Sequence, residues 1–204
     1  MLYNMKKHLF IALLILLTLP IAYAQNNKTS DKPDAKQGEN MKILIAYFSC
    51  TGNTRSLAEQ IAKASKADLY EIKPKAPYSS ADLNWRVNSS RANKENNDPS
   101  SRPAISGSVE NIEKYNIVFL GYPIWWGQAP KIIYTFLESY DFSGKTIVPF
   151  CTSGSSPIGS SASNLHKLCS DKTTWLSGSR FASNTSRSAV VTWIKGLGLN
   201  ITAE

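Results

Sequence analysis

Beyond residue 40, the hydrophobic positions form short apolar runs that alternate with segments of helical spacing. Residues 43–48 are continuously apolar and rich in β-branched and aromatic side chains, which is typical of a strand buried on both faces. Leu57, Ala58 and Ile61 follow at the spacing of one helix face. Further strands are predicted at residues 68–72, 117–121, 146–151 and 174–176. Strands that alternate with helices over short connections predict a parallel α/β sheet.

Later helices are predicted to begin at Pro130 and to cover residues 162–168 and 186–197. The long polar section 73–112 lacks strong periodicity, and we expect one helix in it over residues 79–87, capped by a serine. A section of this length in a compact domain is often functional. A surface excursion without a catalytic role is an equally open interpretation.

Residues 1–24 have the organisation of a secretory signal peptide. Lys6 and Lys7 precede an apolar stretch over residues 9–21, and residues 22–24 form a small-x-small cleavage site. The stretch is shorter than the roughly 20 residues that a membrane-spanning helix needs. We therefore expect an exported protein, in the periplasm of a bacterium, with an uncleaved membrane anchor as the alternative.

Residues 25–40 carry charged and polar side chains without a large apolar residue, so they are predicted to be a disordered linker. The remaining length, residues 41–200, fits a single domain. The chain has 23 Lys and Arg against 15 Asp and Glu, a net charge of +8. This surplus favours anionic ligands or membrane surfaces. The basic residues are scattered and form no stripe with interleaved aromatics, so a nucleic-acid partner is not expected.

The turn Ser49-Cys50-Thr51-Gly52-Asn53-Thr54 separates the first predicted strand from the first helix. The first N–H groups of a helix lack intrahelical partners and lie at the positive end of its dipole, so they can hold a phosphate. Gly52 permits close approach of the backbone, and the neighbouring hydroxyls add donors. Neither the triphosphate-binding nor the dinucleotide-binding glycine pattern is present. Side chains that merely cap the helix are the alternative.

A second loop, Tyr122-Pro123-Ile124-Trp125-Trp126-Gly127-Gln128-Ala129-Pro130, follows the strand predicted at 117–121. Adjacent side chains point in different directions, so we expect one indole to be exposed or to contact a ligand. Stiff loops with large aromatics at the carboxyl end of a parallel strand suit a flat ring system. Packing under a neighbouring loop is the competing interpretation.

The third loop runs over residues 152–161 and follows the strand predicted at 146–151. This loop begins with Thr152, Ser153 and Gly154. Its small residues would let backbone N–H and C=O groups contact the edge of a ligand. The three loops together leave the carboxyl ends of the first, third and fourth strands, where open α/β sheets bind ligands. They imply a mononucleotide with a large flat head.

Three cysteines, Cys50, Cys151 and Cys169, permit either one disulfide with a free thiol or no disulfide. Cys151 ends an apolar run and is expected to be a buried small hydrophobe. A helix N-terminus would lower the pKa of the Cys50 thiol, although a phosphate would compete for the same positive end. No metal-binding cluster with the usual spacing is apparent.

The motifs at residues 47–54, at residues 121–127, and at residues 142–145 with 152–154 resemble the flavodoxin family, most closely its bacterial flavodoxin-like branch with a Pro-Ile-Trp-Trp loop. The resemblance covers roughly residues 41–198. It implies a three-layer, doubly wound, five-stranded parallel sheet that binds FMN. The resemblance places the FMN phosphate at Ser49, Thr51, Gly52, Asn53 and Thr54, with Cys50 in the same loop. Trp125 or Trp126 would lie along the isoalloxazine, with Pro123, Ile124, Gly127, Thr152, Ser153 and Gly154 around its edge.

Small electron-transfer flavodoxins are similar in fold, but they are acidic and cytoplasmic, whereas this chain is basic and bears a predicted signal peptide. The expected function is therefore electron transfer or the reduction of a small acceptor such as a quinone, with Tyr78 and Trp85 as candidate substrate contacts. A protein that binds flavin or another phosphorylated ligand without turnover is the alternative. The electron donor, the acceptor and the oligomeric state are not predicted.

Overall fold

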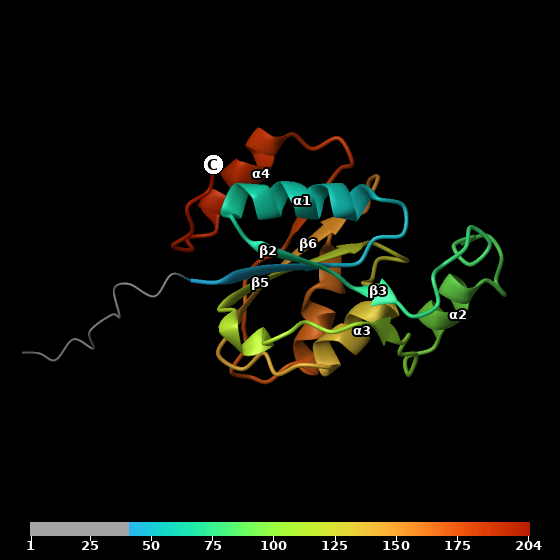
Figure 1. The fold of residues 1–204 in the computed structure, drawn as a ribbon. Helices are drawn as coiled ribbons and strands as arrows, with labels where there is room; N and C mark the ends of the chain where they lie inside the picture. The colour runs from blue at the N-terminus through green and yellow to red at the C-terminus, as the bar shows by residue number, and fades with distance from the viewer. Residues whose placement is uncertain (1–40) are drawn as a thin grey trace, which may run out of the picture. The chain divides into compact units, whose positions relative to one another are not determined.

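The computed structural model describes residues 41–204 (Figure 1). The predicted signal peptide, 1–24, and the predicted linker, 25–40, lie outside the described residues. Within the described part of the chain, no helix has the length and apolar character needed to cross a membrane.

A parallel sheet forms the centre of the domain. Its order is β2 (Asp68–Glu71), β1 (Ile43–Tyr47), β5 (Ile117–Pro123), β6 (Thr146–Thr152) and β7 (Thr174–Trp175), with β8 (Ser179–Phe181) also paired to β6. Every pairing in this sheet is parallel. The prediction of a doubly wound parallel α/β sheet is confirmed. The fifth strand position, predicted as one short strand, is divided between β7 and β8.

Pro149 explains why this position is divided. The Ile147 carbonyl accepts a hydrogen bond of 3.0 Å from the Leu176 N–H, so the backbone groups of alternate residues of β6 face the fifth position. Pro149 is two residues further along, and it has no N–H to offer there. Pairing stops after Ile147 and resumes at Phe150. The break also depends on Gly178, where a Cβ would come within 3.0 Å of the Pro149 carbonyl oxygen.

Helices cover both faces of the sheet, as Figure 1 shows. Helices α1 (Asn53–Ser65) and α4 (Arg187–Gly196) pack on one face, and α3 (Lys131–Glu138) packs on the other with the 3₁₀ helix η3 (Ser163–Leu168). Along β1, Ile43, Ile45 and Tyr47 belong to the core beside α1 and α4, whereas Leu44 and Ala46 belong to the core beside α3. The continuous apolar run in the sequence therefore reflects burial on both faces.

The long polar section forms a short antiparallel pair, β3 (Lys73–Pro74) with β4 (Ile105–Ser106), and between them an excursion over residues 75–104 that contains α2 (Arg91–Asn97). The excursion extends from the edge of the domain where β1 ends (Figure 1). Two further 3₁₀ turns are η1 (Ile112–Lys114) and η2 (Gly159–Ser161).

The helix predicted over residues 79–87 is wrong, because this segment consists of turns. Ser79 and Asp82 make the reciprocal contacts of a capping box, since the Ser79 N–H donates to the Asp82 carboxylate at 2.8 Å and the Asp82 N–H donates to the Ser79 hydroxyl at 3.2 Å. The helix does not continue from this cap, because the Asp82 carbonyl accepts a hydrogen bond from the Ala92 N–H and the Asn93 side chain donates to the carbonyls of Trp85 and Val87. The helix of the excursion begins only after Ser90, whose hydroxyl accepts a hydrogen bond from the Asn93 N–H.

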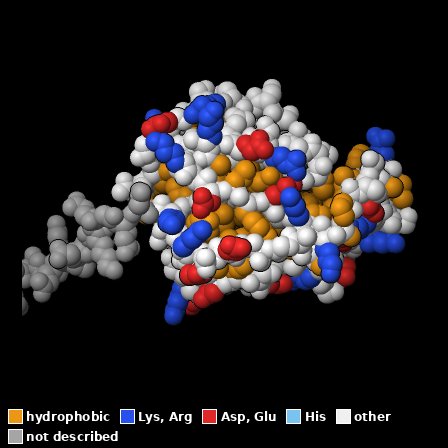
Figure 2. Space-filling model, viewed as in Figure 1, with side chains coloured by type: hydrophobic (Ala, Val, Ile, Leu, Met, Phe, Trp, Pro, Cys, Tyr) orange, Lys and Arg blue, Asp and Glu red, His pale blue; other side chains and the backbone are white. Residues whose placement is uncertain are grey.

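Charged side chains are mixed on the surface. On the face shown in Figure 2, Lys and Arg are interspersed with Asp and Glu and do not gather into a stripe. Several of the cations are paired, for example Arg55 with Glu71 and Arg102 with Glu138. This distribution gives no sign of a nucleic-acid surface on that face.

Gly121 allows β5 and β6 to pack closely. It pairs in register with Phe150, and a Cβ at Gly121 would lie 2.2 Å from the Phe150 ring. The ring is fully buried, so it has little room to move away. We predict that Gly121→Ala lowers the free energy of unfolding by about 1–3 kcal/mol, the usual cost of overpacking.

Urea denaturation followed by circular dichroism measures this change. Gly196→Ala is the matched control, because a Cβ at that exposed position in α4 meets no atom within 4 Å. The control should be neutral or stabilising by up to about 1 kcal/mol. Equal stability of the two variants would contradict the packing account.

Candidate functional site

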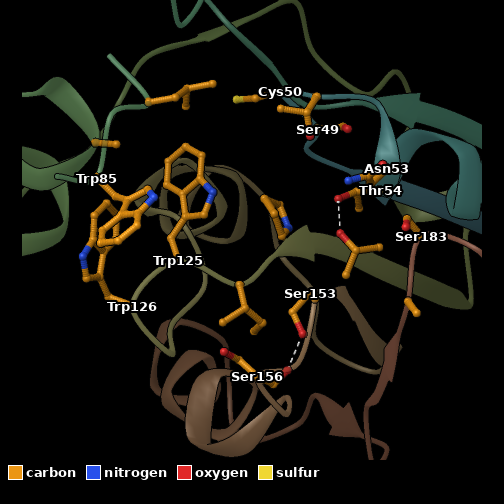
Figure 3. A pocket seen from close by; sticks show the side chains of 18 of the residues that line it. Ser49, Cys50, Asn53, Thr54, Trp85, Trp125, Trp126, Ser153, Ser156 and Ser183 are labelled. Atoms are coloured by element: carbon orange, nitrogen blue, oxygen red, sulfur yellow. Dashed lines mark hydrogen bonds between the residues drawn. The ribbon is translucent and has the colours of Figure 1, made fainter. Parts of the chain in front are cut away.

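A cavity of about 890 Å³ opens at the carboxyl ends of β1, β5 and β6 (Figure 3). It is lined by twelve of the predicted site residues: Ser49, Cys50, Thr51, Asn53, Thr54, Pro123, Ile124, Trp125, Trp126, Thr152, Ser153 and Gly154. Two predicted residues, Gly52 and Gly127, shape the backbone beside the cavity but do not line it. The three loops singled out in the sequence are thus brought together in space.

The loop between β1 and α1 presents backbone donors at one end of the cavity. Gly52 precedes the helix with a φ of 89°, a conformation that favours glycine. Among the described residues no side chain caps α1, and its first turn contains no acidic residue. The Ser49 hydroxyl accepts a hydrogen bond from the Gly52 N–H at 3.1 Å and so stabilises the turn before the helix. The helix start therefore keeps unpaired N–H groups and a positive dipole, which together favour an anion.

Thr54 and Thr152 connect two of the loops. Their hydroxyls share a hydrogen bond of 2.8 Å, and both residues are buried. Thr54 lies in the first turn of α1 and Thr152 ends β6, so this bond fixes the helix start against the third loop. Figure 3 shows it beside Ser49 and Asn53, away from the tryptophans.

The tryptophan loop makes a tight two-residue turn. Trp125 and Gln128 exchange backbone hydrogen bonds of 3.0 and 2.8 Å, and Trp126 and Gly127 between them have φ values of 48° and 74°. Two positive φ angles define a type I′ turn. A left-handed conformation is unusual for a residue as bulky as Trp126, whose side chain remains 41% exposed. The two indoles are 82° apart in orientation, so they present different surfaces to the cavity.

Trp125 is held in place by other aromatic side chains. Its ring makes edge-to-face contacts with Phe48 and Tyr78, with centroids 5.6 and 5.5 Å apart. The Tyr78 hydroxyl donates to the Glu95 carboxylate, which also accepts a hydrogen bond of 2.6 Å from Arg91. Helix α2 therefore anchors the aromatic cluster from behind.

This arrangement changes the role of Tyr78. Its ring does not line the cavity, so its position does not support the expectation that Tyr78 contacts a substrate. Trp85, the other candidate substrate contact, does line the cavity. Burial and the hydrogen bond to Glu95 raise the pKa of the Tyr78 phenol. The side chain thus remains protonated at neutral pH and serves to position Trp125.

The third loop is stabilised by Arg180 of β8. Its guanidinium donates to the Ser153 carbonyl at 3.1 Å and to the Gly154 carbonyl. The Ser153 hydroxyl donates in turn to the Ser156 carbonyl. These bonds draw the loop carbonyls toward Arg180 and hold the polar wall of the cavity in one conformation.

Comparison with known proteins agrees with this architecture. A family model described as Flavodoxin matches residues 42–197. The chain belongs to the flavodoxin family. A search of curated protein sequences found no match.

Several solved structures resemble this flavodoxin-family chain. A crystal structure from Bacteroides eggerthii, provisionally described as a flavoprotein, is 47% identical, with a TM-score of 0.74 over 79% of this chain and 100% of its own. A second, from Bacteroides uniformis with the same description, is 41% identical, with a TM-score of 0.73 over 77% of this chain and 99% of its own. A flavoprotein from Lactobacillus acidophilus in complex with FMN is 20% identical, with a TM-score of 0.59 over 78% of this chain and 99% of its own. At this identity the third structure shows a shared fold only.

Sequence reasoning missed some residues that line the cavity of this flavodoxin-family domain. They are Leu83 and Ala92 of the excursion, Ser156 of the third loop, and Ala182, Ser183 and Asn184. The last three directly follow β8. They obey the same rule as the other loops, because ligand-contacting loops follow the carboxyl ends of parallel strands. Recognition of residues 179–181 as a strand would have identified them.

None of the three cysteines, all of which lie in the described region, forms a disulfide. Burial raises the pKa of Cys50 and of Cys151 to about 12 and that of Cys169 to about 11. The possibility that the helix N-terminus makes Cys50 a reactive thiolate is therefore not supported. Cys50 lines the cavity as a neutral thiol.

We predict that the rate at which iodoacetamide alkylates Cys50 rises about tenfold per pH unit from pH 7 to pH 10. Mass spectrometry of the Cys169→Ser variant measures this rate. The thiolate fraction rises in this way only while the pH is well below the pKa, and an ordinary thiol levels off above about 8.5. A plateau near pH 8 in the folded protein would show that the thiol is not perturbed as described.

Proposed function

We propose that this protein binds FMN in the cavity and uses it for electron transfer or for the reduction of a small acceptor such as a quinone. The supporting observation is a single cavity with an uncapped helix start at one end and indoles at the other (Figure 3). A flavin mononucleotide has the same two parts, a phosphate and a flat ring. A flavoprotein of the same fold, from Lactobacillus acidophilus, is described in complex with FMN.

The donors at the start of α1 fit a phosphate. Backbone N–H groups of Asn53 and Thr54 and the hydroxyls of Ser49 and Thr51 would bind it, and Gly52 would leave the approach clear. No Asp or Glu is among the residues that line the cavity, so no carboxylate repels the anion there. Arg55 is not needed for this role, because its guanidinium is paired with Glu71 at 2.5 Å.

The other end fits a flat aromatic ring. Trp125 makes edge-to-face contacts with Phe48 and Tyr78 and also lines the cavity, where its indole would stack on the ring. Trp126 lines the cavity beside it and is 41% exposed. Thr152, Ser153 and Gly154 would meet the polar edge of the ring. The volume lies within the range of about 300–1,000 Å³ that is usual for cofactor sites.

When bound, the flavin supplies one- or two-electron chemistry. The protein's own residues would bind the phosphate, orient the ring and limit the access of water. Electron or hydride transfer requires no side-chain acid or base, and none of the ionisable side chains Asp, Glu, His, Lys or Arg lines the cavity. The basic net charge distinguishes this chain from acidic electron shuttles and favours a small acceptor over a basic protein partner.

Titration of the purified protein with FMN and with riboflavin tests the proposal. We expect a dissociation constant for FMN at or below about 1 μM, and riboflavin binding at least about tenfold weaker because it lacks the phosphate. Thr51→Glu should weaken FMN binding about tenfold relative to Thr51→Gln, since the added charge repels the phosphate, whereas riboflavin should not distinguish the two variants. Flavin fluorescence provides the readout.

Equal affinity for FMN and riboflavin, or no flavin binding at micromolar concentrations, would contradict the proposal. Addition of NADPH or dithionite and then a quinone to the FMN-loaded protein separates the two possible roles. Repeated reoxidation by the quinone indicates a reductase, and a stable reduced flavin indicates a carrier or a binding protein without turnover.

We also propose export, on the basis of the amino-terminal sequence pattern alone. Expression of the full chain in a Gram-negative host should yield a periplasmic protein that begins at Gln25. Amino-terminal sequencing after cell fractionation measures both. A chain that retains residues 1–24 and sediments with membranes would instead indicate the uncleaved anchor.

A further inference from the structure

Trp85 is the most exposed of the large apolar side chains in the described residues. It is 64% exposed, compared with 44% for Val87, 43% for Leu69 and 41% for Trp126. Trp85 and Trp126 nevertheless line the same cavity, one from the excursion and one from the tryptophan loop. Large exposed aromatics at a cavity mouth often mark a site of interaction.

The turn that carries Trp85 is fixed from behind by a buried amide. Asn93 of α2 is 6% exposed, and its side-chain nitrogen donates to the carbonyls of Trp85 and Val87 at 3.0 and 2.8 Å. The Ala92 N–H also donates to the Asp82 carbonyl at 3.0 Å and closes the base of the turn. The exposed indole is therefore presented by an ordered backbone, which reduces the entropy lost when a ligand binds.

A positive charge accompanies the indole. The Arg86 guanidinium lies over the Trp85 ring, 5.0 Å from its centroid. Two other arginines of the excursion, Arg91 and Arg102, form ion pairs with Glu95 and Glu138, whereas within the described region Arg86 forms none. The residues that line the cavity also include no carboxylate. The Arg86 guanidinium is therefore available to interact with the anionic group of a ligand.

We propose that Trp85, Arg86 and Trp126 form an acceptor subsite at the mouth of the cavity for a flat aromatic molecule that bears a negative charge. The ligand would stack on Trp85 and direct its anionic group toward Arg86. This inference rests on the proposed function, because a quinone bound there would take two electrons from the reduced cofactor and two protons from water to become the hydroquinone. It adds the charge of the acceptor and the residues that select it.

The test uses the FMN-loaded protein and two probes, anthraquinone-2-sulfonate and the uncharged 2-(hydroxymethyl)anthraquinone, measured by calorimetry. We expect Trp85→Ala to weaken both probes about tenfold, as for loss of a stacking contact. Arg86→Gln should remove the preference for the sulfonate, expected to be about threefold or more for a surface charge contact. Val87→Ala and Lys94→Gln are matched controls for an exposed apolar group and an exposed charge on the same excursion, and they should bind both probes as the wild type does.

Three outcomes would overturn the subsite. The first is that neither probe binds the FMN-loaded protein, and the second is an equal loss of probe affinity in Trp85→Ala and Val87→Ala. The third is release of free FMN by the sulfonate, which would mean that the probe competes for the cofactor site. FMN affinity is measured first for every variant. Failure of the wild type to bind FMN overturns the proposed function itself. Binding of FMN without binding of either probe overturns only the subsite.

Discussion

The parallel register of β1, β5 and β6 is the constraint on which the site depends. Because the three strands run in the same direction, their carboxyl ends meet at one edge, and loops distant in sequence form one cavity. Burial on both faces fixes that register, since a shift by one residue would exchange the side chains of the two cores. The hydroxyl contact between Thr54 and Thr152 then fixes the start of α1 against the end of β6.

Each end of the cavity is preorganised by residues that do not line it. Gly52 precedes α1 without a side-chain cap on its first N–H groups, and Arg180 donates hydrogen bonds to the Ser153 and Gly154 carbonyls of the third loop. Tyr78 and its partners on α2 hold Trp125 at a fixed angle. Rigid surroundings of this kind let backbone donors and aromatic surfaces bind a ligand without a large loss of entropy.

The parts of the fold and site that depend on local sequence could be predicted. Residues 49–54 are recognisable because the strand, the turn and the helix start are contiguous in the sequence. The adjacent tryptophans, Trp125 and Trp126, are likewise evident from the sequence alone. Residues 182–184 were missed because β8 has only three residues and its separation from β7 arises from Pro149 on another strand. The helix expected over residues 79–87 failed because the buried Asn93 amide of α2 donates to the carbonyls of Trp85 and Val87 and stabilises turns there. Such contacts are not visible in hydrophobic spacing.

A crystal structure of the protein grown with FMN tests the central claim most directly, namely that the loops after β1, β5 and β6 hold the two ends of one cofactor. The account predicts that the phosphate lies over the first turn of α1, with the ring against the tryptophan loop and its polar edge at residues 152–154. A phosphate bound elsewhere, or a ring that lies outside the cavity, would contradict it.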